Sequence, residues 1–174
     1  MDAKEKKGVI DAITKQTIET ENLLGNIADS TKSIKISGRT RDEWWAFFRL
    51  TISPDNANPA IIRVKLADLS AKWFTAARAH SHAKAEMEYI STIIGQKQVE
   101  AKRKIRDSNQ AIGSGNLNSF SNLAIADLRP IEKASSITVE FWGGILEYLA
   151  NVLKILNQLN FADSNEAKLQ PPGA

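Results

Sequence analysis

The sequence predicts an all-α fold, in which long helices with heptad-like seams are completed as a homo-oligomeric helical ring or bundle. Two long segments carry apolar residues at alternating spacings of three and four, which places each set on one face of a helix. Such spacing, kept over many turns, is typical of coiled-coil seams. In the second segment the apolar face is too wide for one neighbouring helix to cover, which predicts contacts between subunits.

The first predicted helix runs from about Lys4 to Ile36, and Gly38 is its expected stop. Its apolar stripe is thin in large side chains, so we expect this helix to be stable only when it packs against another element. The stripe consists of Ile10, Ile13, Thr17, Thr20, Leu24 and Ile27.

A short aromatic helix is predicted from Arg41 to about Leu50, and it has two interpretations. The rings could stack on nucleic-acid bases while neighbouring arginines contact phosphates. Alternatively, the rings form core, which is the favoured interpretation because paired Trp and Phe side chains bury large areas. The rings are Trp44, Trp45, Phe47 and Phe48, and the arginines are Arg39, Arg41 and Arg49.

A long central helix is predicted after the loop at residues 53–59, which is the best internal boundary. Asn58 and Pro59 are a favourable N-cap and first-turn pair for it. Its seam weakens beyond Ile94, since Lys97 and Ala101 take the next seam positions. The seam consists of Ile62, Leu66, Leu69, Trp73, Ala76, His80, Ala83, Met87, Ile90 and Ile94.

Residues 111–119 are a predicted polar, Gly-rich connection. Its Gly-Ser-Gly run lacks the Lys-Ser/Thr that completes a phosphate loop, so nucleotide binding is not expected. A short irregular or helical stretch should follow and end before Pro130. Its expected apolar anchors are Phe120, Leu123 and Leu128.

The last predicted helix runs from about Ile131 to Leu159 and carries the second seam. Gly143 and Gly144 lie inside it, and since glycine weakens a helix, close approach of another element is the expected reason for them. The polar tail at 162–174 is expected to be disordered. The side chains expected to lie between subunits are Phe141, Trp142, Ile145, Leu149, Val152 and Leu156.

Composition excludes several classes of protein. Cysteine is absent, which excludes disulfides and thiol catalysis and fits a reducing cytoplasm. No apolar run suffices for a membrane span, and the charged N-terminus has no secretory signal. His80 and His82 face different directions on a helix and cannot share a metal, and His80 is expected to be partly buried and hydrogen-bonded. With no nucleophile beside a base and no carboxylate pair, we expect no enzyme, no cofactor and no metal.

The strongest chemical feature is a basic cluster near the end of the central helix. Residues 60–110 carry ten Lys or Arg against five Asp or Glu, although the net charge of the chain is only +3. This excess favours a polyanion partner, because closely spaced cations repel one another until a polyanion neutralises them. The other interpretation is a solvated helix end, where cations favour the helix dipole. The predicted DNA-binding residues are Lys97, Lys102, Arg103, Lys104 and Arg106.

Two segments resemble the UvsY recombination mediators of large tailed phages, over roughly residues 61–161. The run from His80 to Met87 is similar to that family's His-Ser-x-x-Lys-x-Glu-Met stretch. The family's Lys…Tyr-Trp-Gly…Leu…Phe pattern is matched by Lys133, Phe141, Trp142, Gly143, Leu146, Leu153 and Phe161. The family's basic Lys-x-Arg element maps onto Lys104-Ile105-Arg106, with Lys102 as an alternative register. The first 58 residues have no counterpart in the family.

The resemblance implies a homo-oligomeric ring that binds single-stranded DNA in the cytoplasm of a bacterial host. Such mediators help a phage recombinase displace the single-strand-binding protein. The predicted division is an N-terminal helical extension (1–58), a DNA-binding and oligomerisation core (59–161) and the tail (162–174). Two other functions are open: a DNA-packaging or virion assembly ring like a terminase small subunit, and a helical scaffold without nucleic acid. Preference for single strands over duplex would separate the mediator from the packaging ring.

Overall fold

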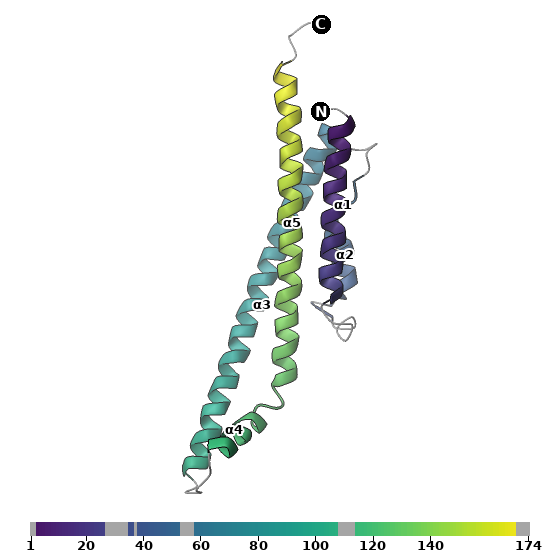
Figure 1. Ribbon diagram of the computed structural model, residues 1–174. Coiled ribbons are helices and arrows are strands. Elements are labelled where there is room, and N and C mark those ends of the chain that lie inside the picture. Colours follow the sequence, from purple (N-terminus) through teal and green to yellow (C-terminus); the bar gives the residue numbers. More distant parts are fainter. Residues whose placement is uncertain (1–2, 27–34, 37, 53–57, 108–113, 170–174) are drawn as a thin grey trace. The chain divides into compact units, whose positions relative to one another are not determined.

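The protein is built of helices, as Figure 1 shows. The computed structural model describes residues 3–26, 35–36, 38–52, 58–107 and 114–169. No strand occurs within these ranges, so the all-α prediction is confirmed. The helices are α1 (Ala3–Asn26), α2 (Arg41–Phe48), α3 (Pro59–Asp107), α4 (Ser114–Leu123) and α5 (Arg129–Leu169).

The chain forms two compact units, and α3 and α5 each contribute to both. One unit consists of Met1–Arg78 and Phe141–Ala174, and the other of Ala79–Glu140. The first unit therefore contains α1, α2, the start of α3 and most of α5. Residues 1–58, which the sequence sets apart as an extension, belong to the same unit as the C-terminal part of α5.

Helix α1 is shorter than the sequence predicts, because it ends at Asn26. Ile36, the expected last residue, instead forms an isolated antiparallel bridge with Arg39. Gly38 lies in this turn with φ of 82°, a left-handed conformation that glycine adopts without steric cost. The stripe on α1 is confirmed at Ile13, Thr20 and Leu24, which are buried; Ile27 lies outside the described residues.

Helix α3 begins as the sequence predicts. The Asn58 side-chain oxygen accepts a hydrogen bond from the Ile61 N–H at 2.9 Å, which satisfies one of the N–H groups that a helix start leaves unpaired. The predicted seam is the face that α3 buries. Its buried members are Ile62, Leu69, Ala76, Ala83, Ile90 and Ile94, and the four others are partly buried.

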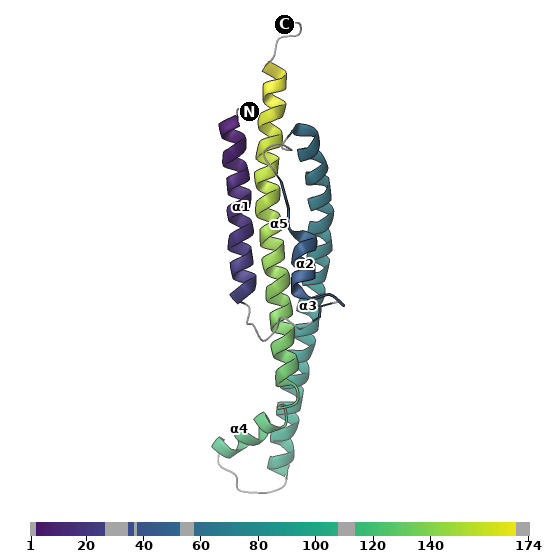
Figure 2. The same ribbon diagram turned by 90° about the vertical axis from the view of Figure 1, so that its right-hand side faces the viewer.

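The wide apolar face of α5 is covered within the single chain, by α1, α2 and α3. Figure 2 shows α1 along one side of α5, with α2 and α3 along the other. The six side chains expected between subunits are all at most 2% exposed. A second subunit is therefore not needed to cover this face, and the sequence could not show that the N-terminal helices do so. The six residues are Phe141, Trp142, Ile145, Leu149, Val152 and Leu156.

Gly144 lies where α1 approaches α5 closely, as the sequence predicts for the glycine pair. A Cβ atom placed on Gly144 would lie 3.3 Å from the Leu24 Cδ2 atom and 3.6 Å from that of Leu23. The glycine thus allows two leucines of α1 to pack directly on the α5 backbone.

The second unit differs from expectation around α4. Residues 114–119, expected in a connection, form the first part of this helix. The buried anchor is Ile125, which packs with Ile90 and Ile94 of α3. Of the expected anchors, Leu128 is confirmed, since it packs partly buried against this cluster, whereas Phe120 and Leu123 are 50% and 72% exposed. The pattern misled because Ile125 lies in a turn, where neither helical nor strand periodicity applies.

Helix α5 is longer at both ends than the sequence predicts. It begins at Arg129, so that Pro130 occupies its first turn, where proline's missing N–H costs nothing. It continues to Leu169, so residues 162–169, expected in a disordered tail, are helical. Residues 170–174 lie outside the described part of the chain.

The Tyr148 side chain joins three segments of the first unit. It is fully buried, and burial raises the pKa of its hydroxyl. The hydroxyl accepts a hydrogen bond from the Leu50 N–H at 2.8 Å and lies 3.4 Å from the Thr17 hydroxyl. Its ring also meets the Trp45 ring edge-on, with 4.8 Å between centroids. Through this residue α5 contacts both α1 and the chain that leaves α2.

We expect Tyr148→Phe to lower the free energy of unfolding by about 1–3 kcal/mol, because it leaves the buried Leu50 N–H without an acceptor. Urea unfolding followed by circular dichroism measures this change. Tyr89→Phe is the matched control, since Tyr89 is 68% exposed and its hydroxyl makes no hydrogen bond within the described residues. Equal stability of the two variants would contradict the role of Tyr148.

Candidate nucleic-acid interface

The basic cluster lies on the last turns of α3, in the second unit, at the end of the helix near α4 (Figure 1). Arg103, Lys104 and Arg106 are exposed, whereas Lys97 and Lys102 are half-buried. The positions match those that the sequence predicts, because α3 continues without a break to Asp107.

Two cations of the cluster pair with carboxylates one turn away on the same helix. The Lys104 Nζ atom lies 2.8 Å from a Glu100 carboxylate oxygen, and the Arg103 Nε atom lies 3.8 Å from one of Asp107. The hydrogen bond from Lys104 and its charge hold the pKa of Glu100 below the ordinary value. Exposed pairs of this kind contribute only about 0–1 kcal/mol, so a phosphate can replace the carboxylate at small cost.

Lys97, unlike the other cations of the cluster, pairs with a carboxylate that lies outside α3. Its Nζ atom lies 3.2 Å from the Asp127 carboxylate, which belongs to the turn after α4. The same turn holds the buried Ile125 against α3. Lys97 therefore joins two elements of the second unit, and a phosphate would have to compete with this ion pair.

Lys102 and Arg106 have no carboxylate partner among the residues that the structure describes. They are one turn apart on α3, so their charges repel each other. An anion between them would remove that repulsion. The other three residues predicted to bind DNA each pair with a carboxylate. Lys102 and Arg106 are the two that no described carboxylate neutralises.

A groove of about 520 Å³ runs along α3 and reaches the cluster at Arg103. Val99, which is 68% exposed, is the aliphatic side chain of its lining, and Gly95 leaves the helix backbone accessible. Its lining residues are Thr92, Gly95, Gln96, Val99, Glu100 and Arg103.

The aromatic helix α2 is partly core, in agreement with the favoured interpretation. Phe48 is fully buried and packs edge-on against Trp142, with 5.9 Å between ring centroids. Trp45 is half-buried and donates its indole N–H to Glu21 at 2.9 Å. Phe47, however, is 42% exposed.

The three arginines near α2 have unequal access to a ligand. Arg41 is buried, and Arg49 forms an ion pair with Glu21 at 3.4 Å. Arg39 instead extends over an aromatic ring, with its guanidinium carbon 4.8 Å from the Trp44 ring centroid. Of the three, Arg39 is therefore the one that is exposed without a carboxylate ion pair among the described residues.

A reciprocal capping box fixes the start of α2. The Thr40 N–H donates to the Glu43 carboxylate at 2.7 Å, and the Glu43 N–H donates to the Thr40 hydroxyl at 3.3 Å. The hydrogen bond from the Thr40 backbone, followed by that from its hydroxyl, lowers the pKa of Glu43. The carboxylate form of Glu43 is therefore the form that caps the helix.

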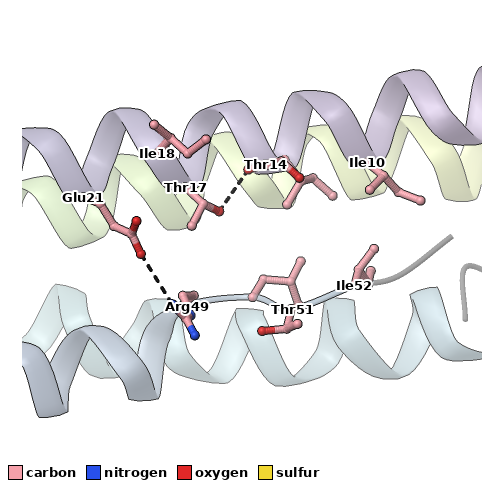
Figure 3. Close-up of a pocket in the computed structure, with 10 residues that line it drawn as sticks. Ile10, Thr14, Thr17, Ile18, Glu21, Arg49, Thr51 and Ile52 are labelled. Carbon is pink, nitrogen blue, oxygen red and sulfur yellow. Dashed lines mark hydrogen bonds and ion pairs between the residues drawn. The ribbon is translucent and has the colours of Figure 1, made fainter.

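A second cavity, of about 270 Å³, lies between α1 and the extended chain that follows α2 (Figure 3). Isoleucine and threonine side chains line most of it, and the ion pair of Glu21 with Arg49 closes one end. Figure 3 shows the Thr17 hydroxyl bonded back to its own helix, to the Ile13 carbonyl at 2.9 Å. The lining offers apolar contact and two charges that already neutralise each other.

The described residues contain no group of three metal-binding side chains, and no helix among them is long and apolar enough to cross a membrane. His80 is partly buried on the seam, as predicted, and burial followed by the charge of Lys84 lowers its pKa. The predicted hydrogen bond of His80 is not found among the described residues.

Comparison with known proteins gives no relative: no family model, no curated protein and no solved structure matches this chain.

We expect Thr40→Ala to raise the pKa of Glu43 toward its ordinary value, because the variant removes the hydroxyl that bonds to the carboxylate. Since the folded-state pKa is lowered, the capping box stabilises α2 above the ordinary carboxyl pKa and is lost as the pH falls through the lowered value. Carbon-detected NMR titration of the Glu43 carboxyl group measures the shift. In Thr75→Ala, the lost hydroxyl bonds among the described residues to the Ala71 carbonyl alone, so the Glu43 titration should stay as in the wild type. An unchanged Glu43 pKa in Thr40→Ala would contradict the capping role.

Proposed function

We propose that this protein is a non-enzymatic mediator that binds single-stranded DNA and helps a phage recombinase assemble in place of single-strand-binding protein. The observation that carries the binding step is the cluster at the end of α3, where Lys102 and Arg106 have no carboxylate partner among the described residues. The loading step rests on the sequence resemblance to recombination mediators.

The ion pairs of the cluster suit reversible contact with a phosphate backbone. Lys104 and Arg103 are exposed and can exchange their carboxylates for phosphates at small cost. Contacts to phosphates carry no sequence information, which suits a protein that must act on any single strand. Binding of this kind is strongly dependent on salt, since each contact releases a counterion.

Self-association is part of the proposal, although the six α5 side chains that the sequence assigns to the interface are buried within the single chain. One chain offers only a small cluster, and several copies on one strand would multiply weak contacts into tight binding. Val99 and Tyr89, each 68% exposed on α3, support a contact surface on that helix instead.

We expect Lys102→Ala combined with Arg106→Ala to weaken binding of single-stranded oligonucleotides whatever their sequence. Each lost phosphate contact should reduce the slope of log affinity against log salt by about 0.7, so the double variant should lose about 1.4. Fluorescence anisotropy at several salt concentrations, with single-stranded and duplex oligonucleotides, measures both quantities. Duplex preference would favour the packaging ring, and no binding would favour the scaffold.

The matched control is Arg63→Ala combined with Arg78→Ala, which removes the same charge from exposed positions of α3 outside the cluster and outside the motifs that carry the resemblance. This control should retain the wild-type salt slope. Added to recombinase and DNA coated with single-strand-binding protein, the control should still speed filament assembly and the cluster variant should not. If both double variants reduce the slope of log affinity against log salt by the same amount, the overall charge of the protein and not the cluster determines binding.

We expect Glu100→Gln to act in the opposite direction and strengthen binding to single strands. The variant removes the carboxylate that neutralises Lys104 at 2.8 Å and so frees this cation for a phosphate. The salt slope should become steeper by about 0.7 in the same titration. Glu88→Gln, at an exposed site on α3 without an ion pair among the described residues, is the control. Weaker binding by Glu100→Gln would show that Glu100 positions the cluster instead of masking it.

A further inference from the structure

Four side chains of the first unit form an aromatic–cation patch, of which Arg39 and Phe47 are exposed and Trp44 and Lys72 are partly buried. The Arg39 guanidinium carbon lies 4.8 Å from the Trp44 ring centroid and 5.6 Å from that of Phe47. The Lys72 Nζ atom of α3 lies 5.1 Å from the Phe47 ring centroid. Two cations therefore stand against one exposed ring.

The Phe47 ring packs against two other aromatic rings of α2, which hold it in place. It meets Phe48 edge-on at 5.0 Å and Trp44 edge-on at 6.1 Å, while Trp44 stacks on the buried Phe48. Arg39 and Lys72 both lie over this ring, so a planar ligand must take the place of the exposed Arg39 side chain there. Because the ring itself is fixed and 42% exposed, such a ligand can stack on it without first ordering the phenyl side chain.

The two cations of the patch differ in their freedom. Lys72 is bound to Asp68 at 3.0 Å and its side chain is mostly buried, so it is a fixed part of the patch. Arg39 is exposed and has no carboxylate ion pair among the described residues. The bridge to Ile36 and the left-handed turn at Gly38 fix the backbone from which Arg39 extends.

We infer that the aromatic–cation patch stacks a base of single-stranded DNA on Phe47, while Arg39 contacts the adjoining phosphate. A nucleotide unit presents a planar ring and an anion a short distance apart, which the patch matches with an exposed ring and a cation beside it. Stacking tolerates any base, since every base has a π-face. The inference rests on the proposed single-strand binding and adds a contact of different chemistry to that of the α3 cluster.

The decisive experiment compares an oligo-dT strand with an abasic strand of equal length, which keeps the phosphates and lacks the bases. Phe47→Leu should weaken oligo-dT binding about tenfold, the order of magnitude expected for one stacked base, and leave abasic binding and the salt slope unchanged. The matched control is Phe74→Leu, because Phe74 is 69% exposed, touches the Trp73 ring, and has no cation over it within the described residues. This control should bind both strands as the wild type does.

A second measurement uses the unaltered protein. Strands that carry 5-iododeoxyuridine cross-link on irradiation to aromatic side chains that stack on them. Trypsin releases residues 42–49 as one peptide, which holds both Trp44 and Phe47. Cross-links should appear on this peptide and should be lost in Phe47→Leu.

Three results would overturn the inference. Phe47→Leu could bind oligo-dT normally while the Lys102 and Arg106 double variant is weakened, in which case the proposed function stands and stacking on the patch is wrong. Cross-links confined to peptides of α3 would also exclude stacking on the patch, even if Phe47→Leu failed to fold. If the wild type binds neither strand, the proposed function itself fails and the patch is only the rim of the core.

Discussion

The width of the apolar face on α5 is the constraint on which the first unit depends. Three elements are needed to cover it, and a fully buried tyrosine lies at their meeting point. Because the Tyr148 hydroxyl must find partners once it is buried, its bond to the Leu50 N–H fixes the chain that leaves α2. The short helix α2, too short to be stable alone, is thereby held with its aromatic side chains in a defined place.

The features that the sequence predicts best are the apolar seams, because the period of the apolar residues encodes them. The seams of α3 and α5 are predictable because each helix buries one continuous face. The cap at Asn58 is predictable because its hydrogen bond is local in the sequence. The period of an apolar face does not encode which element covers it, so the sequence predicts a second subunit over α5, where the structure has α1, α2 and α3. Likewise the turn residue Ile125 was missed, since its burial depends on α3, about thirty residues earlier in the chain.

The charges of the candidate site were predictable, but only some of their partners were. The pairs of Lys104 with Glu100 and of Arg103 with Asp107 have the spacing of one helical turn and can be read from the sequence. The partner of Lys97 is Asp127, which lies in the turn after α4 and not on α3. The cation over the Phe47 ring of α2 is likewise supplied by another element, since Lys72 belongs to α3. Contacts between elements distant in the sequence therefore decide which cations are bound within the fold and which remain available to a ligand.

A protein that delivers DNA to another protein must bind it without retaining it. Exposed ion pairs meet this need, because they are weak, so a cation can leave its carboxylate for a phosphate and return to it when the strand is passed on. Stacking on a ring does not release counterions, so it would hold a base at salt concentrations where phosphate contacts have weakened. On the proposed function, the cluster on α3 would govern how fast a strand is gained and lost, and the aromatic–cation patch would set a residual affinity that salt does not abolish.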